Sequence, residues 1–361
     1  MQSFKKAFFV SVAFILTFVI ALSVVLMPAM ANGSDYNDSA VRKELSGSLD
    51  YLFIGASHCM ASFVPNVIDE ELGVNSYNLS SSAASMEGKM YLLKKEIERN
   101  SLDTVVIDIA FDTLLRRPEN DHARGEAMVV CKLDSMAERI KYTVNSVSFF
   151  NSDYENFFSV FSRYGISAWK KLLSGEETFY NNGEKGFVPE KTCDVTLTDY
   201  EITSSYNLGT LDLNYSKKNV EILQEMIRLC KVNNIRTVVL VIPISEARIW
   251  KTSNWSGFVQ SIKNICDTEN CEFYDYNLIK NRSEIFSDDV SFVNQTHMSE
   301  TGAWAFSLRF AQIEKMLQQD GNKINVDELF YSSYDEMKTD SQYMEYYLSH
   351  KDVSGQTNAE Q

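Results

Sequence analysis

Apolar and polar positions alternate in blocks along most of this chain, in a pattern typical of alternating strands and helices. Short apolar runs bounded by turn residues predict buried strands of a parallel sheet. Stretches with apolar residues every three or four positions predict helices on its faces. The predicted strands are residues 49–54, 74–79, 104–110, 235–242 and 271–276. The predicted helices are residues 66–72, 86–99, 219–232, 257–266 and 299–317, with a loop at 288–296.

The repeated order of strand, helix and strand predicts a three-layer α/β fold, in which a parallel sheet carries helices on both faces. Residues 116–214 break the pattern, because they are charged, aromatic and irregular. Helices are expected there at residues 132–146 and 154–173. We interpret residues 116–214 as a mostly helical insertion beside the sheet. It is either a lid or acceptor-binding surface, or a segment that only packs against the domain.

The first 31 residues differ in kind from the rest. Lys5 and Lys6 precede an apolar run over residues 7–27, interrupted only by two serines and a threonine. About twenty apolar residues in a helix cross the hydrocarbon core of a bilayer. The preceding lysines favour a cytoplasmic N-terminus, which leaves the remainder outside the cell. The segment is therefore a single-pass membrane anchor, or a signal peptide cleaved after the Ala-Met-Ala of residues 29–31.

Composition completes the expected organisation. Polar residues 32–47 predict a linker, residues 48–320 the α/β domain, and residues 321–361 an acidic, tyrosine-rich tail. The formal net charge of −15 argues against a nucleic-acid partner, because a phosphate backbone attracts basic faces. The four histidines and six cysteines do not show the spacing of a metal site, so neither a metal nor another cofactor is expected.

Candidate chemistry lies where the predicted strands end, which is where parallel sheets bind ligands. Ser57 follows the first strand, Asp112 follows the third, and His297 precedes the last helix. A nucleophilic serine needs a base and backbone donors for the oxyanion. Taken singly, Ser57 fits an ordinary strand-to-helix turn and His297 fits a structural or helix-capping histidine. Because both are expected at one edge of the sheet, we favour a catalytic pair.

These segments resemble the SGNH/GDSL hydrolase superfamily, especially its membrane-anchored branch, which includes the D-alanyl-lipoteichoic-acid biosynthesis protein DltD and alginate-acetylation proteins. The resemblance covers residues 50–316 without the insertion. Its first block is Phe53-Ile54-Gly55-Ala56-Ser57-His58 and its last is Asn294-Gln295-Thr296-His297. The resemblance implies a flavodoxin-like sheet, with Ser57 as nucleophile, His297 as general base and Asn294 as the residue that orients the base.

The resemblance also implies an oxyanion hole. Its donors would come from Ser57, from Ser81 and Ser82 after the second strand, and from the position of Asp112. The family has Gly-x-Asn at this last position, whereas the chain has Ala-Phe-Asp. A carboxylate there would repel an oxyanion unless it is protonated or turned aside.

The base block departs from the family as well, because Asn294 stands where the family has aspartate. A neutral carboxamide can still orient the imidazole, but it does not compensate the charge of the imidazolium. Asp108 and Asp289 are the alternative sources of that charge.

The resemblance implies acyl transfer at the cell surface. Ser57 would accept an acyl group, a hydroxyl of a glycan or anionic polymer would take it, and a membrane-bound O-acyltransferase would be the donor partner. Hydrolysis by a carbohydrate esterase is the same chemistry with water as acceptor. The departures at Asn294 and Asp112 motivate a second hypothesis from another class, a catalytically weak scaffold that binds polymer or organises a partner.

Overall fold

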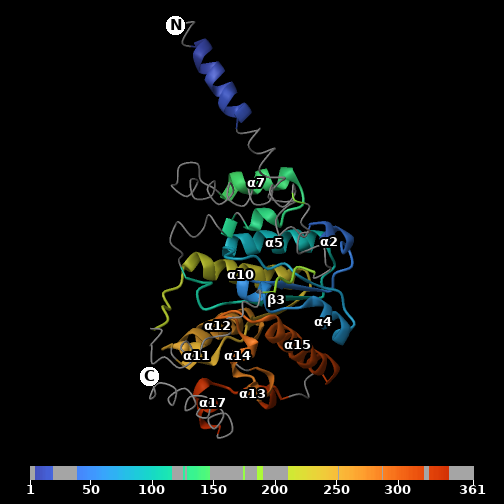
Figure 1. Cartoon of the computed structure of the whole chain (residues 1–361), viewed down its shortest axis with the longest axis vertical. Helices are drawn as coiled ribbons and strands as arrows, with labels where there is room; N and C mark the ends of the chain where they lie inside the picture. Colours follow the sequence, from blue (N-terminus) through green and yellow to red (C-terminus); the bar gives the residue numbers. More distant parts are fainter. Residues whose placement is uncertain are drawn as a thin grey trace. The chain divides into compact units, whose positions relative to one another are not determined.

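The computed structural model divides into two compact units. It describes residues 5–18, 39–115, 125–126, 128–146, 174, 185–189, 210–250, 252–286, 288–320 and 325–340. One unit is drawn from Met1–Lys43 and Arg117–Gly183, and the other from Glu44–Arg116 and Glu184–Gln361. The second unit contains the sheet (Figure 1). It also takes in residues 185–189 and 210–214, which we had assigned to the insertion.

Five parallel strands form the sheet in the order β2-β1-β3-β4-β5. This confirms the predicted parallel α/β fold, and a strand lies within each of the five predicted segments. The order reverses between β1 and β3, which is the topological switch point of a flavodoxin-like sheet. The strands are β1 (Tyr51–Ile54), β2 (Ser76–Asn78), β3 (Thr104–Asp108), β4 (Arg236–Val241) and β5 (Glu272–Asp275).

Helices cover both faces of the sheet, as predicted. Figure 1 shows α5 and α10 on one side of β3 and α4 and α15 on the other. Helix α12 contacts α10 and β5, which places it in the layer of α10. The helices of the two layers are α4 (Pro65–Leu72) and α15 (Glu300–Asp320), and α5 (Met86–Arg99), α10 (Lys217–Val232) and α12 (Trp255–Glu269).

Several short helices lie at the strand ends and in the segment after α15. Residues 288–291, which we predicted as loop, form the one-turn helix α14. Its last carbonyls are occupied by Ser299, whose hydroxyl donates to Val290 O (2.6 Å) and whose N–H donates to Ser291 O (2.9 Å). The other short helices are α3 (Ser57–Met60), α11 (Glu246–Trp250), η2 (Tyr276–Leu278), α13 (Arg282–Ile285), α16 (Val326–Leu329) and α17 (Tyr334–Thr339).

Helices α16 and α17 lie in the segment that we predicted as a tail. The Tyr334 hydroxyl donates to a carboxylate oxygen of Asp275 at the end of β5 (2.8 Å). Phe330 belongs to the main apolar cluster, and Met337 is fully buried. Residues 325–340 are therefore packed against the sheet domain.

Aromatic packing joins α15 to the segment that follows β1. The Phe63 ring stacks on Phe53 of β1 at 4.2 Å and lies 5.0 and 5.1 Å from the rings of Phe306 and Phe310 on α15. Ser307 of α15 adds two hydrogen bonds, because its hydroxyl accepts from the N–H of Val64 (2.8 Å) and donates to the carbonyl of Ser62 (3.1 Å). These contacts fix α15 laterally on the sheet.

An ion-pair network holds the C-terminal half of α15. Glu314 is fully buried and its carboxylate accepts from Arg236 of β4 (2.5 Å), which also binds Glu272 of β5. The Tyr51 hydroxyl of β1 donates to the same Glu314 carboxylate (3.3 Å). Two strands therefore bind the helix directly and a third is joined to it through Arg236, which leaves α15 little freedom to slide or tilt.

The other unit includes a helix over residues 5–18, most of α2 (Ser39–Glu44), and α7 (Met136–Ser146). The guanidinium of Arg42, which lies in the predicted linker, is buried and pairs with Asp134 (2.8 Å). No helix of the part that the structure describes is long and apolar enough to cross a bilayer. Residues 19–27 of the expected anchor, and the expected helix at 154–173, lie outside the described residues.

The aromatic contact between β1 and α15 makes Phe63 a strong test of the core. We expect Phe63→Ala to lower the free energy of unfolding by about 3–5 kcal/mol, because it removes a fully buried ring from a close-packed cluster. Leu308→Ala, on the same helix but 42% exposed, should cost about 1 kcal/mol or less. Urea unfolding followed by fluorescence measures both, and equal losses would contradict this account of the core.

Candidate functional site

Ser57 stands at the first position of α3, immediately beyond the carboxyl end of β1. Only glycine fits at position 55 of the turn that presents it. A Cβ there would lie 2.3 Å from the Cβ of Cys59 and 2.9 Å from the Cβ of Asp108. The chain can therefore bend sharply after β1 and leave the serine hydroxyl at the edge of the sheet.

Asn78, at the end of β2, holds this turn from the neighbouring strand. Its buried carboxamide donates to the carbonyls of Cys59 (2.9 Å) and Phe63 (3.0 Å), and its oxygen accepts from the N–H of Ser80 (3.2 Å). We did not predict this role. The signal in the sequence is an asparagine between two apolar residues of a buried strand, Tyr77 and Leu79.

The structure brings Ser57 and His297 together. Ser57 Oγ lies 2.9 Å from His297 Nε2, a hydrogen-bonding distance between residues 240 positions apart in the sequence. His297 lies in a short loop before α15. An antiparallel bridge between Phe292 and Met298 closes this loop. The predicted meeting of the two residues at one edge of the sheet is therefore present.

Asn294 orients the imidazole. Its Oδ1 lies 3.1 Å from His297 Nδ1 and accepts from the backbone N–H groups of Thr296 and His297, both at 2.9 Å. These donors require an oxygen at this place, so the carboxamide presents its acceptor to Nδ1. Nδ1 then carries the proton, and Nε2 acts as the acceptor of the Ser57 hydroxyl.

Comparisons with known proteins find similarity only among solved structures. No protein-family model matches the sequence, and neither does any curated protein. Similar solved structures include a GDSL-like lipase from Bacteroides thetaiotaomicron, with 11% identity over 80% of this chain and 100% of that chain and a TM-score of 0.35. Another is a "putative acylhydrolase" from Bacteroides fragilis, with 10% identity over 77% and 95% of the two chains and a TM-score of 0.36. The site has to be judged from its own geometry.

Two of the N–H groups predicted for the oxyanion hole make no hydrogen bond in the described part of the chain. The N–H groups of Ser57 and Ser82 have no acceptor within the described part of the chain. We also expected a contribution from Ser81, but its N–H donates to the carbonyl of Gly55 (3.3 Å). This corrects the predicted set of donors, because that hydrogen bond is part of the turn that positions Ser57.

Asp112, the fourth residue predicted for the oxyanion hole, lies in the turn after β3 and is partly exposed. Its carboxylate acts electrostatically on the guanidinium of Arg248, which follows β4. The two side chains form no ion pair among the described residues. Asp112 thus contributes a negative charge beyond the carboxyl end of β3, and the guanidinium of Arg248 lies within its electrostatic influence.

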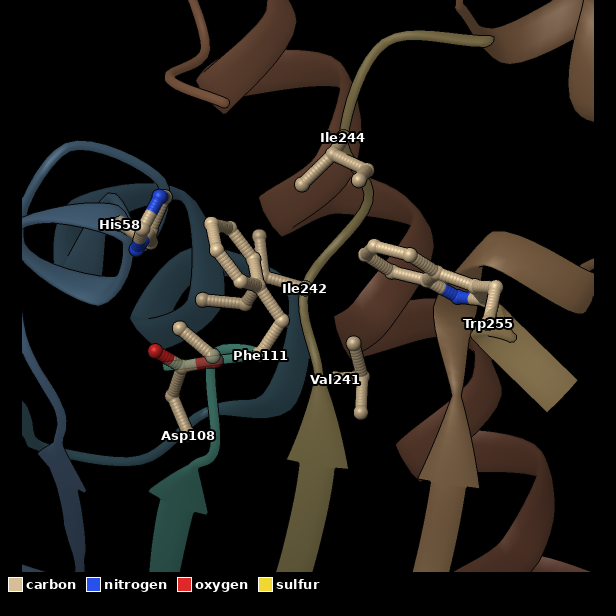
Figure 2. A pocket seen from close by; sticks show the side chains of 8 residues that line it. His58, Asp108, Phe111, Val241, Ile242, Ile244 and Trp255 are labelled. Carbon is tan, nitrogen blue, oxygen red and sulfur yellow. The ribbon is translucent and has the colours of Figure 1, made fainter. Parts of the chain in front are cut away.

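His58 lies against the base and not against the nucleophile. Its ring stacks on that of His297, with centroids 4.6 Å apart and planes 15° from parallel. The His58 ring also lines a small cavity of about 10 Å³, together with Asp108, Phe111 and Trp255 (Figure 2). That is about the room of one water molecule. The stack restrains the imidazole of His297, a contact that the sequence did not indicate.

Asp108 is buried below the nucleophile turn at the carboxyl end of β3. Burial raises the pKa of Asp108 to about 7, against the opposing effects of the Lys89 ammonium and a hydrogen bond from the Ile242 N–H. Its Oδ2 has no hydrogen-bond partner in the described part of the structure. Asp108 does not face His297 Nδ1, where Asn294 and Thr296 lie. It therefore does not replace the missing aspartate.

The side chain of Asp289, the other alternative source of charge, lies outside what the structure describes. Within the described ranges, no three His, Cys, Asp or Glu side chains are arranged to hold a metal ion. The chemistry of the described site is that of a hydroxyl, an imidazole and backbone donors.

The raised pKa of Asp108 generates a prediction about stability. An unfolded aspartate ionises near pH 4, whereas folded Asp108 ionises near pH 7. Between these values the folded protein binds the additional proton, so this group lowers the free energy of unfolding as pH rises. Asp108→Asn removes that loss. We expect the stability of the variant relative to wild type to increase by on the order of 1 kcal/mol or more between pH 5 and pH 8.

Urea unfolding at the two pH values measures this difference. A relative stability that stays constant or falls between pH 5 and pH 8 would contradict a buried carboxyl that titrates near neutrality.

Proposed function

We propose that this chain is a serine enzyme of the SGNH type, which forms an ester between Ser57 and an acyl group. The hydrogen bond between Ser57 Oγ and His297 Nε2 carries the proposal, because it places a hydroxyl against an imidazole whose other nitrogen is already oriented. The parallel sheet, the position of Ser57 after β1 and the resemblance of its two motif blocks support the same assignment.

The arrangement suits two acyl-transfer steps. Ser57 Oγ attacks the carbonyl carbon of an ester while its proton moves to His297 Nε2. The N–H groups of Ser57 and Ser82 stabilise the oxyanion. The intermediate collapses to the acyl-serine, and the leaving alcohol takes the proton from His297. An acceptor hydroxyl then gives its proton to His297 and attacks the acyl-serine, which restores the Ser57 hydroxyl.

We propose a hydroxyl of a cell-surface glycan or anionic polymer as the acceptor in this second step. The apolar run at residues 7–27 supports a chain held at the membrane with its sheet domain outside. There a membrane-bound O-acyltransferase would supply the acyl group, as in the DltD and alginate-acetylation branch that the chain resembles. With water as acceptor the same site is a carbohydrate esterase.

A second candidate function is a catalytically weak scaffold that binds polymer. The neutral Asn294 motivates it, because a carboxamide beside His297 Nδ1 does not compensate the imidazolium that forms during turnover. In a serine protease with an Asp-His-Ser triad, an asparagine in place of the aspartate lowers turnover by about 10⁴, partly through the wrong tautomer. Here the backbone donors to Asn294 Oδ1 hold the correct tautomer, so the loss from charge alone is smaller.

The first test is covalent labelling of Ser57. We expect a fluorophosphonate probe to label the full chain and an aryl acetate to be hydrolysed, because both reactions need only the nucleophile and its base. Ser57→Ala should abolish labelling and lower hydrolysis about a thousandfold or more. Ser48→Ala, at an exposed serine before β1, should behave like wild type. Wild-type protein that neither reacts nor turns over would leave the scaffold as the remaining candidate.

The second test restores the missing charge. Asn294→Asp keeps the shape of the side chain and adds a carboxylate beside His297 Nδ1. We expect kcat for the aryl acetate to rise about tenfold or more, because the imidazolium is then compensated. Asn325→Asp, which adds the same charge at the exposed start of α16, should have no effect. Unchanged or lower turnover in Asn294→Asp would show that charge compensation is not what limits this site.

A further inference from the structure

A guanidinium lies at the rim of the site on a well-fixed turn. Arg248 belongs to α11, which follows β4. Its N–H donates to the hydroxyl (3.2 Å) and carbonyl (3.1 Å) of Ser245, and the Ser245 N–H donates to Gln295 O in the loop of the base (3.3 Å). Glu246 of the same turn pairs with the buried Arg282 (3.5 Å). The turn that carries Arg248 is therefore joined directly to the segment that carries His297.

Aromatic rings connect this guanidinium to the catalytic pair. The rings of His297 and His58 lie 4.6 Å apart, and those of His58 and Phe111 lie 6.5 Å apart. The Arg248 guanidinium lies over the Phe111 ring, 4.9 Å from its centroid. Figure 2 shows the Phe111 ring between His58 and Trp255. Ser57, Phe111 and Arg248 are all partly exposed, so a substrate can reach along this row.

The hydrogen-bonding capacity of Arg248 is unused. Its Nε is buried and has no hydrogen-bond partner among the residues that the structure describes, and the guanidinium forms no ion pair there. Burial lowers the pKa of Arg248 and the Asp112 carboxylate acts against this, but a guanidinium stays charged in either case. A buried, charged N–H group without an acceptor is unfavourable, and a carboxylate or phosphate group of a ligand would relieve this cost by accepting its hydrogen bond.

We infer that Arg248 is a specificity-determining residue, which binds a carboxylate or phosphate group of the substrate acylated or deacylated at Ser57. The planar guanidinium matches the geometry of both anions, and its position over the Phe111 ring holds it beside the site. The chain has a formal net charge of −15, so a local cation is needed to hold an anionic substrate. The inference rests on the proposed function, and it names the class of substrate for that site.

Turnover of paired esters tests the inference. The 4-nitrophenyl monoesters of succinate, adipate and suberate carry a carboxylate at increasing distance from the scissile carbonyl, and alkanoate esters of matched length are neutral. At the best spacer length, Arg248→Gln should lower kcat/KM for the charged ester about tenfold or more. It should change kcat/KM for the neutral ester less than about threefold. Arg248→Lys keeps the positive charge but loses the planar pair of N–H donors. Its kcat/KM for the charged ester should lie between the values of wild type and Arg248→Gln.

The matched control is Arg228→Gln, which removes a guanidinium from the exposed face of α10, where it pairs with Glu269. It should leave both esters unchanged. Equal losses for charged and neutral esters in Arg248→Gln would overturn the inference, because they indicate a structural role. No change for either ester would overturn it as well.

A second measurement does not need turnover. In Ser57→Ala protein, the Nε–H resonance that disappears in Arg248→Lys should shift when inorganic phosphate or acetate is added. The response to each anion distinguishes a phosphate from a carboxylate ligand. If this shift occurs but wild-type protein hydrolyses no ester, the proposed function fails and the anion site stands. If esters are hydrolysed and this resonance responds to neither anion, the inference alone fails.

Discussion

The packing of α15 against the segment behind the nucleophile is the interaction on which the rest of the site depends. Phe63 and the Ser307 hydroxyl join that segment to the helix, while Glu314 binds Arg236 at the other end of the helix. Close-packed interiors tolerate little displacement. The 2.9 Å separation of Ser57 Oγ and His297 Nε2 therefore depends on contacts made by residues that do not touch either side chain.

The sequence was sufficient for the sheet and for the pair at its edge. Short apolar runs bounded by turn residues, such as the one that contains Thr104–Asp108, have few alternatives to a buried strand, and parallel strands bring their carboxyl ends to one edge. The finer features depend on hydrogen bonds between distant segments. The use of the Ser81 N–H by Gly55 and the hold of Asn78 on α3 have no local periodic signal. The one-turn helix α14 exists because Ser299 occupies its carbonyls, which no pattern within residues 288–291 reveals.

A neutral carboxamide, and not a carboxylate, contacts the His297 imidazole at Nδ1. Within the described part of the chain, the groups that meet at Ser57 and His297 are two hydroxyls, two imidazoles and a carboxamide, and Asn294 Oδ1 accepts from two backbone N–H groups. The charged groups lie further out, with Asp112 and Arg248 at the rim and Asp108 below the turn. The charges that act on the site therefore come from the surrounding residues, and the residue that orients the His297 imidazole is neutral.

The 240-residue separation of Ser57 and His297 has a consequence for assembly. All five strands and the serine precede residue 297, so a chain still being synthesised can form the sheet before its base exists. Closing so long a loop is among the last and slowest steps in folding. The hydrogen bond between Ser57 and His297 can consequently form only after the last helix docks, and an unfinished chain carries the serine without its imidazole partner.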